Sequence, residues 1–97
     1  MAKEVIWTES AWLDLEEIAD YIANDSPNYS KVFVSEIEEA VNSLSVFPEL
    51  GRIVPEYNED HIRELFVRNY RLIYKNLSNE VNIISIIHGA RDLWELI

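Results

Sequence analysis

The chain has 97 residues, of which 48% are hydrophobic and 27% charged, and it contains no cysteine. This composition fits one folded domain in a reducing compartment, and it excludes disulfides and thiolate metal sites. The net charge of −10 opposes long-range attraction to nucleic acid. Because no apolar run approaches the ~20 residues of a membrane helix and the N-terminus lacks a signal-peptide core, we expect a single cytoplasmic domain over residues 1–97 without membrane contact.

The charge is unevenly distributed along the chain. Residues 1–50 carry a net charge of −9 and residues 51–97 only −1, and five of the six basic residues in the second half are arginine. The simplest interpretation of the acidic half is a pair of solvated helix faces. Clustered arginines can bind phosphate or carboxylate groups through paired hydrogen bonds. The second half therefore holds the candidate binding residues.

The first half of the chain predicts a strand followed by two helices. The segment KEVIW (3–7) is rich in Val, Ile and Trp, as strands are. Apolar residues at helical spacing after a cap at Thr8 or Ser10 predict a helix over about 9–24. Ser26-Pro27 ends it and begins a second helix that reaches about Phe47. The short connection predicts antiparallel neighbours.

The second half predicts a loop and three strands. Residues 47–61 contain Pro, Gly and Asn and form the loop. The strands IRELFV and YRLIYK flank a turn at Arg68-Asn69, where Asn tolerates left-handed backbone. The apolar run VNIISII (81–87) predicts a central strand covered on both sides. The fold class is α+β: an antiparallel sheet with the helical hairpin on one face, in the order β-α-α-β-β-β, and a short helical turn at the C-terminus.

His88 and Arg91 follow the most apolar strand. A histidine can donate or accept a proton near pH 7, and an arginine stabilises negative charge on a phosphate. The pair therefore suits phosphodiester cleavage, and it suits binding of a carboxylate on a partner equally well. The alternative is a strand-end histidine beside an ion pair between Arg91 and a nearby acid such as Asp92.

Four further cationic side chains lie on the predicted hairpin: Arg63, Arg68, Arg71 and Lys75. Strand alternation places Arg71 and Lys75 on the face opposite Tyr74. If Tyr74 packs on the helices, the two cations point to the uncovered face, where we expect the cationic side chains to gather. The alternative is a solvated face coated by long charged side chains. Trp94, in the amphipathic segment DLWELI, either docks on its own domain or contacts a partner.

The sequence offers no signal for a metal or a cofactor. His61 and His88 are the only histidines, and the carboxylates show no ligand spacing. Gly51 and Gly89 stand alone, so there is no glycine-rich phosphate loop. We therefore expect no metal site and no cofactor.

Four segments together resemble a known family: SAWLDLEEIADYIANDSP, FVSEIEEAVNSLSVFPELGR followed by VPE, IRELFVRNYRLIYK and VNIISIIHGARD. They are similar, in order and over almost the whole chain, to the RelE/ParE superfamily of toxins from type II toxin–antitoxin modules. The Phe47-Pro48…Gly51-Arg52 pattern and the ending from His88 to Asp92 are closer to ParE.

The resemblance implies a sheet with a helical hairpin against it and a cognate antitoxin that covers the working surface. ParE-like members block DNA gyrase. RelE-like members cleave messenger RNA in the ribosome without a metal; for that activity Arg63, Arg71 and Arg91 would hold phosphates and His88 would act as acid or base. In either case Arg63, Arg68, Arg71, Lys75 and Trp94 are the candidate residues for binding antitoxin or target.

Three hypotheses follow. The first is a gyrase inhibitor, favoured by the ParE-like pattern, the acidic surface and the lack of any tyrosine after residue 74. The second is a metal-independent messenger RNA endoribonuclease. The third is an inactive member that only binds an antitoxin-like peptide. We expect either a homodimer or a toxin–antitoxin hetero-oligomer.

Overall fold

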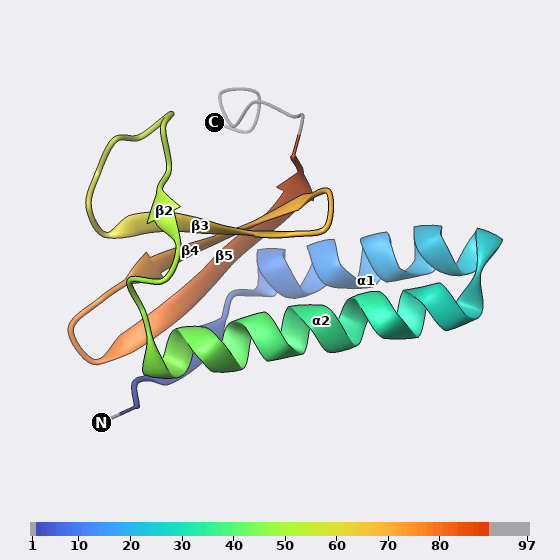
Figure 1. Cartoon of the computed structure of the whole chain (residues 1–97), viewed down its shortest axis with the longest axis horizontal. Coiled ribbons are helices and arrows are strands. Elements are labelled where there is room, and N and C mark those ends of the chain that lie inside the picture. Colours follow the sequence, from blue (N-terminus) through green and yellow to red (C-terminus); the bar gives the residue numbers. More distant parts are fainter. Residues whose placement is uncertain (1, 90–97) are drawn as a thin grey trace.

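The computed structural model describes residues 2–89 and places two helices against one face of a five-stranded sheet (Figure 1). The elements are β1 (Glu4–Trp7), α1 (Glu9–Asp25), α2 (Pro27–Val46), β2 (Arg52–Ile53), β3 (Ile62–Val67), β4 (Tyr70–Asn76) and β5 (Glu80–His88). The α+β fold with an N-terminal helical hairpin is confirmed. The predicted C-terminal helical turn lies outside the described residues. Neither helix has a stretch apolar enough to span a bilayer.

Side-chain caps determine where the two helices begin. The Thr8 hydroxyl accepts a hydrogen bond from the Ala11 amide at 3.1 Å, and the Ser26 hydroxyl accepts one from Tyr29 at the same distance. Pro27 is the first residue of α2, where its missing N–H costs nothing. Both starts agree with the sequence signals, and the helices pack side by side as the short connection predicts.

The strand order is β1-β5-β4-β3-β2. Strands β2 to β5 pair antiparallel, as predicted, but β1 runs parallel to β5, with Val5 opposite Val81. The prediction of a wholly antiparallel sheet is therefore wrong at this edge. Tight turns force β3, β4 and β5 to alternate in direction. No such turn joins β1 to β5, because the whole helical hairpin and three strands lie between them.

Two local features differ from the sequence prediction. The short strand β2 forms inside the segment predicted as loop, where Arg52 pairs opposite Glu64. At the β3–β4 turn the left-handed residue is Arg68, with φ of 57°, whereas the prediction assigned that role to Asn69. The Asn69 carbonyl instead accepts a hydrogen bond from the Gly89 amide at 2.6 Å.

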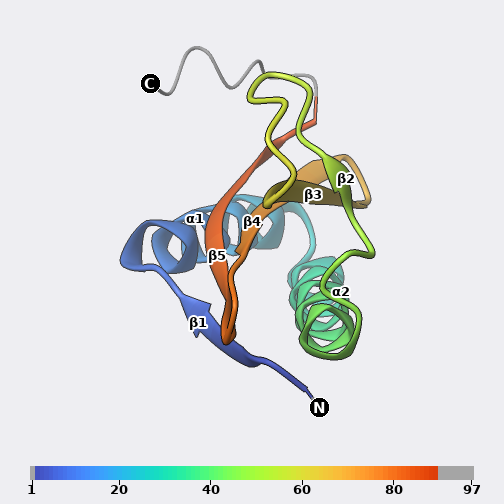
Figure 2. The same cartoon turned by 90° about the vertical axis from the view of Figure 1, so that its left-hand side faces the viewer.

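The sheet separates two hydrophobic clusters. The larger lies under the helices and includes Phe33, Leu72 and Tyr74; the smaller lies on the opposite face. Its buried members are Val54, Ile62, Ile73 and Ile87. Figure 2 shows the loop between β2 and β3 on the side of the sheet away from the helices. That face is therefore partly covered by the chain itself.

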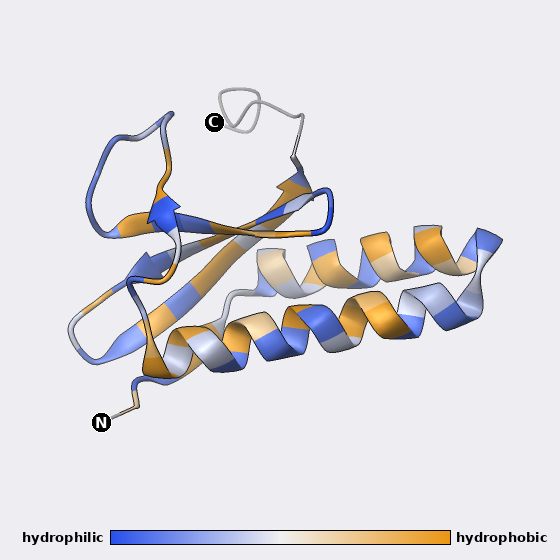
Figure 3. Ribbon diagram, in the orientation of Figure 1, coloured by the Kyte–Doolittle hydropathy of each residue, from blue (hydrophilic) through white to orange (hydrophobic). Residues whose placement is uncertain are grey.

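The long apolar run of β5 contains a β-bulge. Ile73 pairs with Ser85 but Tyr74 pairs with Ile83, so Ile84 is the extra residue. The bulge shifts the alternation, so that Ile83 and Ile86, three residues apart, both face the helices, while Ile84 and Ile87 pack with the smaller cluster. Strand β5 is accordingly hydrophobic along much of its length (Figure 3). The prediction of a strand covered on both faces is confirmed, but β5 is not the central strand: it lies between β4 and β1, and β1 pairs with it only as far as Ile83.

Tyr74 ties the chain after α2 to the sheet. Its hydroxyl donates to the Pro48 carbonyl at 2.8 Å and accepts from the Gly51 amide at 2.9 Å. A Cβ at Gly51 would lie 2.7 Å from this hydroxyl and would overlap the Glu64 carbonyl. Burial raises the pKa of Tyr74, which keeps the hydroxyl protonated as a donor. Close approach of backbone to strand thus requires glycine here.

We predict that Tyr74→Phe lowers the free energy of unfolding by about 1–3 kcal/mol, because it leaves a buried amide and a carbonyl without their partner. Tyr29→Phe is the matched control, since it removes a hydroxyl from a 41% exposed ring; we expect a change within about 0.5 kcal/mol. Urea titration of both variants measures the difference. Equal stability of the two would show that the Tyr74 hydrogen bonds contribute nothing.

Candidate functional site

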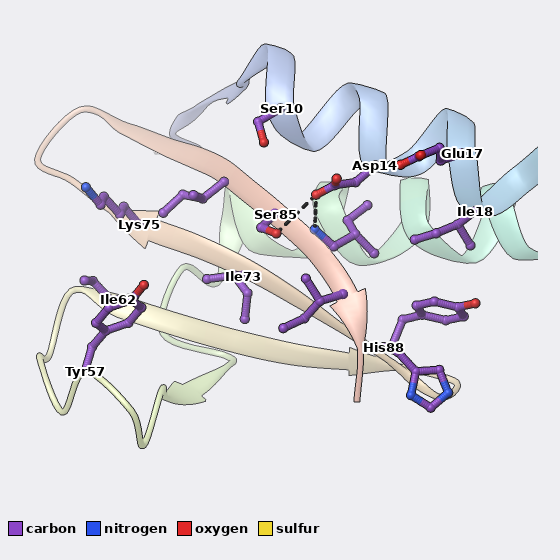
Figure 4. A pocket seen from close by; sticks show the side chains of 14 residues that line it. Ser10, Asp14, Glu17, Ile18, Tyr57, Ile62, Ile73, Lys75, Ser85 and His88 are labelled. Atoms are coloured by element: carbon purple, nitrogen blue, oxygen red, sulfur yellow. Dashed lines mark hydrogen bonds between the residues drawn. The ribbon is translucent and has the colours of Figure 1, made fainter. Parts of the chain in front are cut away.

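A groove of about 620 Å³ lies on the sheet beside α1 (Figure 4). Isoleucines from three strands form its apolar floor: Ile62, Ile73, Ile84 and Ile87. Ser10, Asp14 and Glu17 of α1 line one rim, and Tyr57 from the β2–β3 loop lies at the opposite side. Lys75 and His88 stand toward different ends of the groove. An apolar floor with charged borders suits an amphipathic segment of a partner protein.

The α1 rim also protects the edge of β5 beyond the short β1. The Asp14 carboxylate accepts hydrogen bonds from the Ile86 amide at 3.0 Å and the Ser85 hydroxyl at 3.1 Å. The Thr8 hydroxyl donates to the Ile83 carbonyl at 2.8 Å. These bonds satisfy backbone groups that an edge strand would otherwise leave open to another chain. Asp14 therefore has a structural role, while Glu17 is exposed.

Arg71 is 4% exposed and lies between two carboxylates on the face away from the helices. Its Nε donates to Glu64 at 2.5 Å, and its two Nη atoms donate to Glu56 at 2.9 and 2.8 Å. The hydrogen bonds that Arg71 donates to Glu56, and then to Glu64, raise the pKa of Arg71 above its ordinary value, against the opposing effect of burial. The positive charge of Arg71 is therefore neutralised inside the protein.

Glu64 is shared between two arginines. It is 1% exposed and accepts a second hydrogen bond from Arg52 at 2.6 Å. The Arg52 guanidinium also lies 5.4 Å from the centre of the Phe66 ring. The cluster Arg52–Glu64–Arg71–Glu56 joins β2, β3, β4 and the β2–β3 loop, and a buried carboxylate of this kind requires such pairing.

The other hairpin arginines do not join Arg71. Arg63 pairs opposite Tyr74, so it projects toward the helical side, where its Nη1 donates to the Gly51 carbonyl at 2.9 Å and its Nη2 to Asp60 at 3.0 Å. Arg68 donates to Glu36 of α2 at 2.6 Å. This hydrogen bond lowers the pKa of Glu36 and raises that of Arg68.

Arg71 and Lys75 lie on the face away from the helices, as expected, but Arg71 is buried in its ion pairs instead of exposed there, and the expectation is wrong for Arg63 and Arg68. The strand register sets the face of Arg63, and the turn directs Arg68 toward α2. Lys75 lines the groove and makes no ion pair with any residue in 2–89.

His88 is exposed at the end of β5, and its ring lies 5.6 Å from that of Tyr70 in an edge-on arrangement. Because His88 pairs with Tyr70 while Arg71 pairs with Ile87, the side chains of His88 and Arg71 leave the sheet on opposite faces. Arg91 and Trp94 lie outside the described residues. Within residues 2–89 no three His, Asp or Glu side chains are grouped to hold a metal ion.

Sequence reasoning predicted no contact for three acidic residues of this region, Glu64, Glu56 and Asp14. Glu64 alternates with Leu65 and pairs opposite Ile73, so it shares a face with Arg71; a correct register would have revealed it. Glu56 lies in a loop and carries no periodic signal. Asp14 was interpreted as part of a solvated face, yet it caps the β5 edge.

Comparison with known proteins agrees with this fold. Residues 5–93 match the family model described as "ParE toxin of type II toxin-antitoxin system, parDE". The chain is 35% identical to Toxin RelE2 of Caulobacter vibrioides over 89 residues, which are 91% of this chain and 97% of that protein.

Two solved structures share the architecture. The chromosomal ParDE toxin–antitoxin system from P. aeruginosa has a TM-score of 0.73 at 23% identity, covering 90% of this chain and 96% of that one. The RelBE2 toxin–antitoxin complex from Mycobacterium tuberculosis has a TM-score of 0.64 at 22% identity, covering 91% and 99%. Since the family model spans nearly the whole chain and the Caulobacter relative is matched almost end to end, the chain belongs to the ParE/RelE superfamily of type II toxin–antitoxin toxins.

Proposed function

We propose that this toxin stops growth by binding DNA gyrase, and that a cognate antitoxin neutralises it by occupying the groove beside α1. In this proposal the chain acts through protein–protein contact and requires no metal or cofactor. The family assignment supports the antitoxin, because the similar solved structures are ParDE and RelBE2 systems. The choice of gyrase is supported by the ParE family model and by the charges of the groove.

The observation that carries the proposal is the enclosure of Arg71. A ribonuclease needs cations free to stabilise phosphate charge. Arg71 instead donates three hydrogen bonds to Glu64 and Glu56. Arg63 lies on the other face, and the groove borders on the carboxylates of Asp14 and Glu17. A phosphate approaching this face meets acids before it meets a free arginine, which disfavours RNA as the ligand.

The groove itself suits a protein segment. Its isoleucine floor offers apolar surface to the hydrophobic side of a helix or strand, and Lys75 can pair with an acid on that segment. This arrangement supports the proposed role of Lys75 in antitoxin binding. Arg68, bound to Glu36, and Arg63, bound to Asp60, would contribute at most at the margin of that contact.

The alternative is a messenger RNA endoribonuclease in which His88 transfers a proton and Arg91 holds a phosphate. Its support is the exposure of His88 at the end of β5, three residues before Arg91. An inactive member that only binds antitoxin is the third possibility. The experiments below separate the three.

Induction of the chain without antitoxin should arrest growth, reduce negative supercoiling of a reporter plasmid and leave messenger RNA intact. His88→Ala should arrest growth as strongly as the unchanged chain, because a protein-binding inhibitor needs no proton transfer. Plasmid topology and transcript length are read from the same culture. Cleaved transcripts that disappear in His88→Ala would establish the ribonuclease instead, and undisturbed growth would indicate the inactive member.

Arg71→Ala and Lys75→Ala should behave differently. Removing Arg71 leaves two carboxylates without their shared partner, so we expect a loss of about 3 kcal/mol of unfolding free energy. Lys75→Ala should change stability by less than about 0.5 kcal/mol and weaken binding of the antitoxin encoded alongside. Chemical denaturation and calorimetric titration give the two quantities. A stable Arg71→Ala variant that lost all toxicity would point to a working cation and against its structural role.

A further inference from the structure

Strand β1 forms one border of the sheet and has no strand on its outer side within residues 2–89 (Figure 2). The protein protects the next part of the same border, where Asp14 accepts a hydrogen bond from the Ile86 amide of β5. No residue in 2–89 covers the main chain of β1 in this way. An edge strand left open is a template for pairing with another chain.

The pairing with β5 determines which main-chain groups of β1 point outward. The Thr8 amide donates to the Ile83 carbonyl at 3.1 Å, so Thr8 and, two residues before it, Ile6 direct their main-chain groups toward β5. Val5 and Trp7 alternate with them and direct theirs away from β5. Within residues 2–89 the amides and carbonyls of Val5 and Trp7 take part in no hydrogen bond.

Apolar side chains flank these open groups on both faces of the strand. Val5 and Trp7 pack partly against the larger hydrophobic cluster. The Trp12 ring lies edge-on to the Trp7 ring with 5.6 Å between their centres, yet half of Trp12 stays exposed. Ile6 lies on the opposite face and is 37% exposed. A second strand beside β1 would remove part of this apolar surface from water.

Two copies of β1 can pair antiparallel in one register that uses every open group. Outward-facing residues must lie opposite each other to exchange hydrogen bonds, so Val5 of one copy lies opposite Trp7 of the other. Ile6 then lies opposite Ile6 on the two-fold axis. A register that pairs Val5 with Val5, or Trp7 with Trp7, leaves open groups unused, because Lys3 bonds to α2 and Glu9 belongs to α1.

The same register brings compatible side chains together. On the helical side, Val5 of the second copy would contact Trp7 and lie next to Trp12. On the other side, the two Ile6 side chains would meet in a pair without hydrogen bonds, where side chains approach most closely. Glu4, the only charged residue of β1, would lie opposite Thr8. No acid therefore faces an acid across the strands, which matters in a chain of net charge −10.

We propose that β1 pairs with β1 of a second copy of this chain and joins the two sheets into one. Residues 3–8 do not line the groove, so each copy keeps its groove for the antitoxin. The inference is independent of the proposed target, because pairing of the two strands requires neither gyrase nor antitoxin.

The test is analytical ultracentrifugation of the full chain without antitoxin. The dimer fraction should rise with chain concentration across about 1–100 µM, as expected of a small interface. It should also rise as salt increases from about 50 to 200 mM, because screening weakens the repulsion between two acidic chains.

Val5→Pro should weaken dimerisation about 10-fold or more, because it removes one outward amide from each copy and so two hydrogen bonds from the dimer. The pairing of β1 with β5 should persist, since that amide does not take part in it. The urea midpoint of the variant checks that the fold is intact.

Position 6 gives a test specific to two-fold pairing. Ile6→Glu and Ile6→Lys should each sediment as a monomer where the unchanged chain dimerises, because like charges would meet at the axis. An equimolar mixture of the two variants should form a heterodimer. Val32→Glu and Val32→Lys, at a 46% exposed position of α2, are the matched controls and should dimerise as the unchanged chain does.

The outcomes decide which chain covers β1. Dimers that are lost in each Ile6 variant and recovered in the mixture support the inference. A chain that stays monomeric over the whole range, or a dimer that the Val5 and Ile6 variants leave unchanged, overturns it. A monomeric chain whose antitoxin affinity falls in Val5→Pro would also overturn it and would assign the open edge to a strand of the antitoxin.

Discussion

The ion cluster around Arg71 is the interaction on which the side of the sheet away from the helices depends. Arg71 comes from the middle of the sheet, and a guanidinium buried there requires carboxylate partners. Glu64 supplies one from the next strand and Glu56 supplies one from the β2–β3 loop. The ion cluster holds that loop and, through Arg52, the short strand β2. Both segments are thereby kept in place over the smaller hydrophobic cluster.

Tyr74 fixes a connecting segment in the same way on the helical side of the sheet. Its hydroxyl bonds the chain at Pro48 and Gly51, immediately before β2 begins. Two neighbouring segments, the one after α2 and the β2–β3 loop, are thus fixed to opposite faces of the same strand. Residues 47–52 and 70–74, which lie far apart in the sequence, meet through these bonds.

The ion pairs of the arginines also determine where unpaired charge remains on the molecule. The arginines of the described residues form ion pairs that hold loops and helices in place. The unpaired charge on the described surface is therefore mainly that of the acidic side chains of the helical hairpin. The groove offers an apolar floor, with the carboxylates of Asp14 and Glu17 along its border. This distribution of charge is the physical basis for proposing a protein partner in the groove rather than an RNA substrate on the sheet.

Local patterns in the sequence determined much of the fold. Thr8 and Ser26 cap the helices, the apolar spacing sets their buried sides, and the Arg68-Asn69 turn joins two strands, because each depends on neighbours within a few residues. Tertiary structure alone decided the parallel pairing of β1, the bulge at Ile84 and the partners of Arg71. Those depend on strand register and on contacts between distant segments, and a shift of one residue would move each side chain to the opposite face.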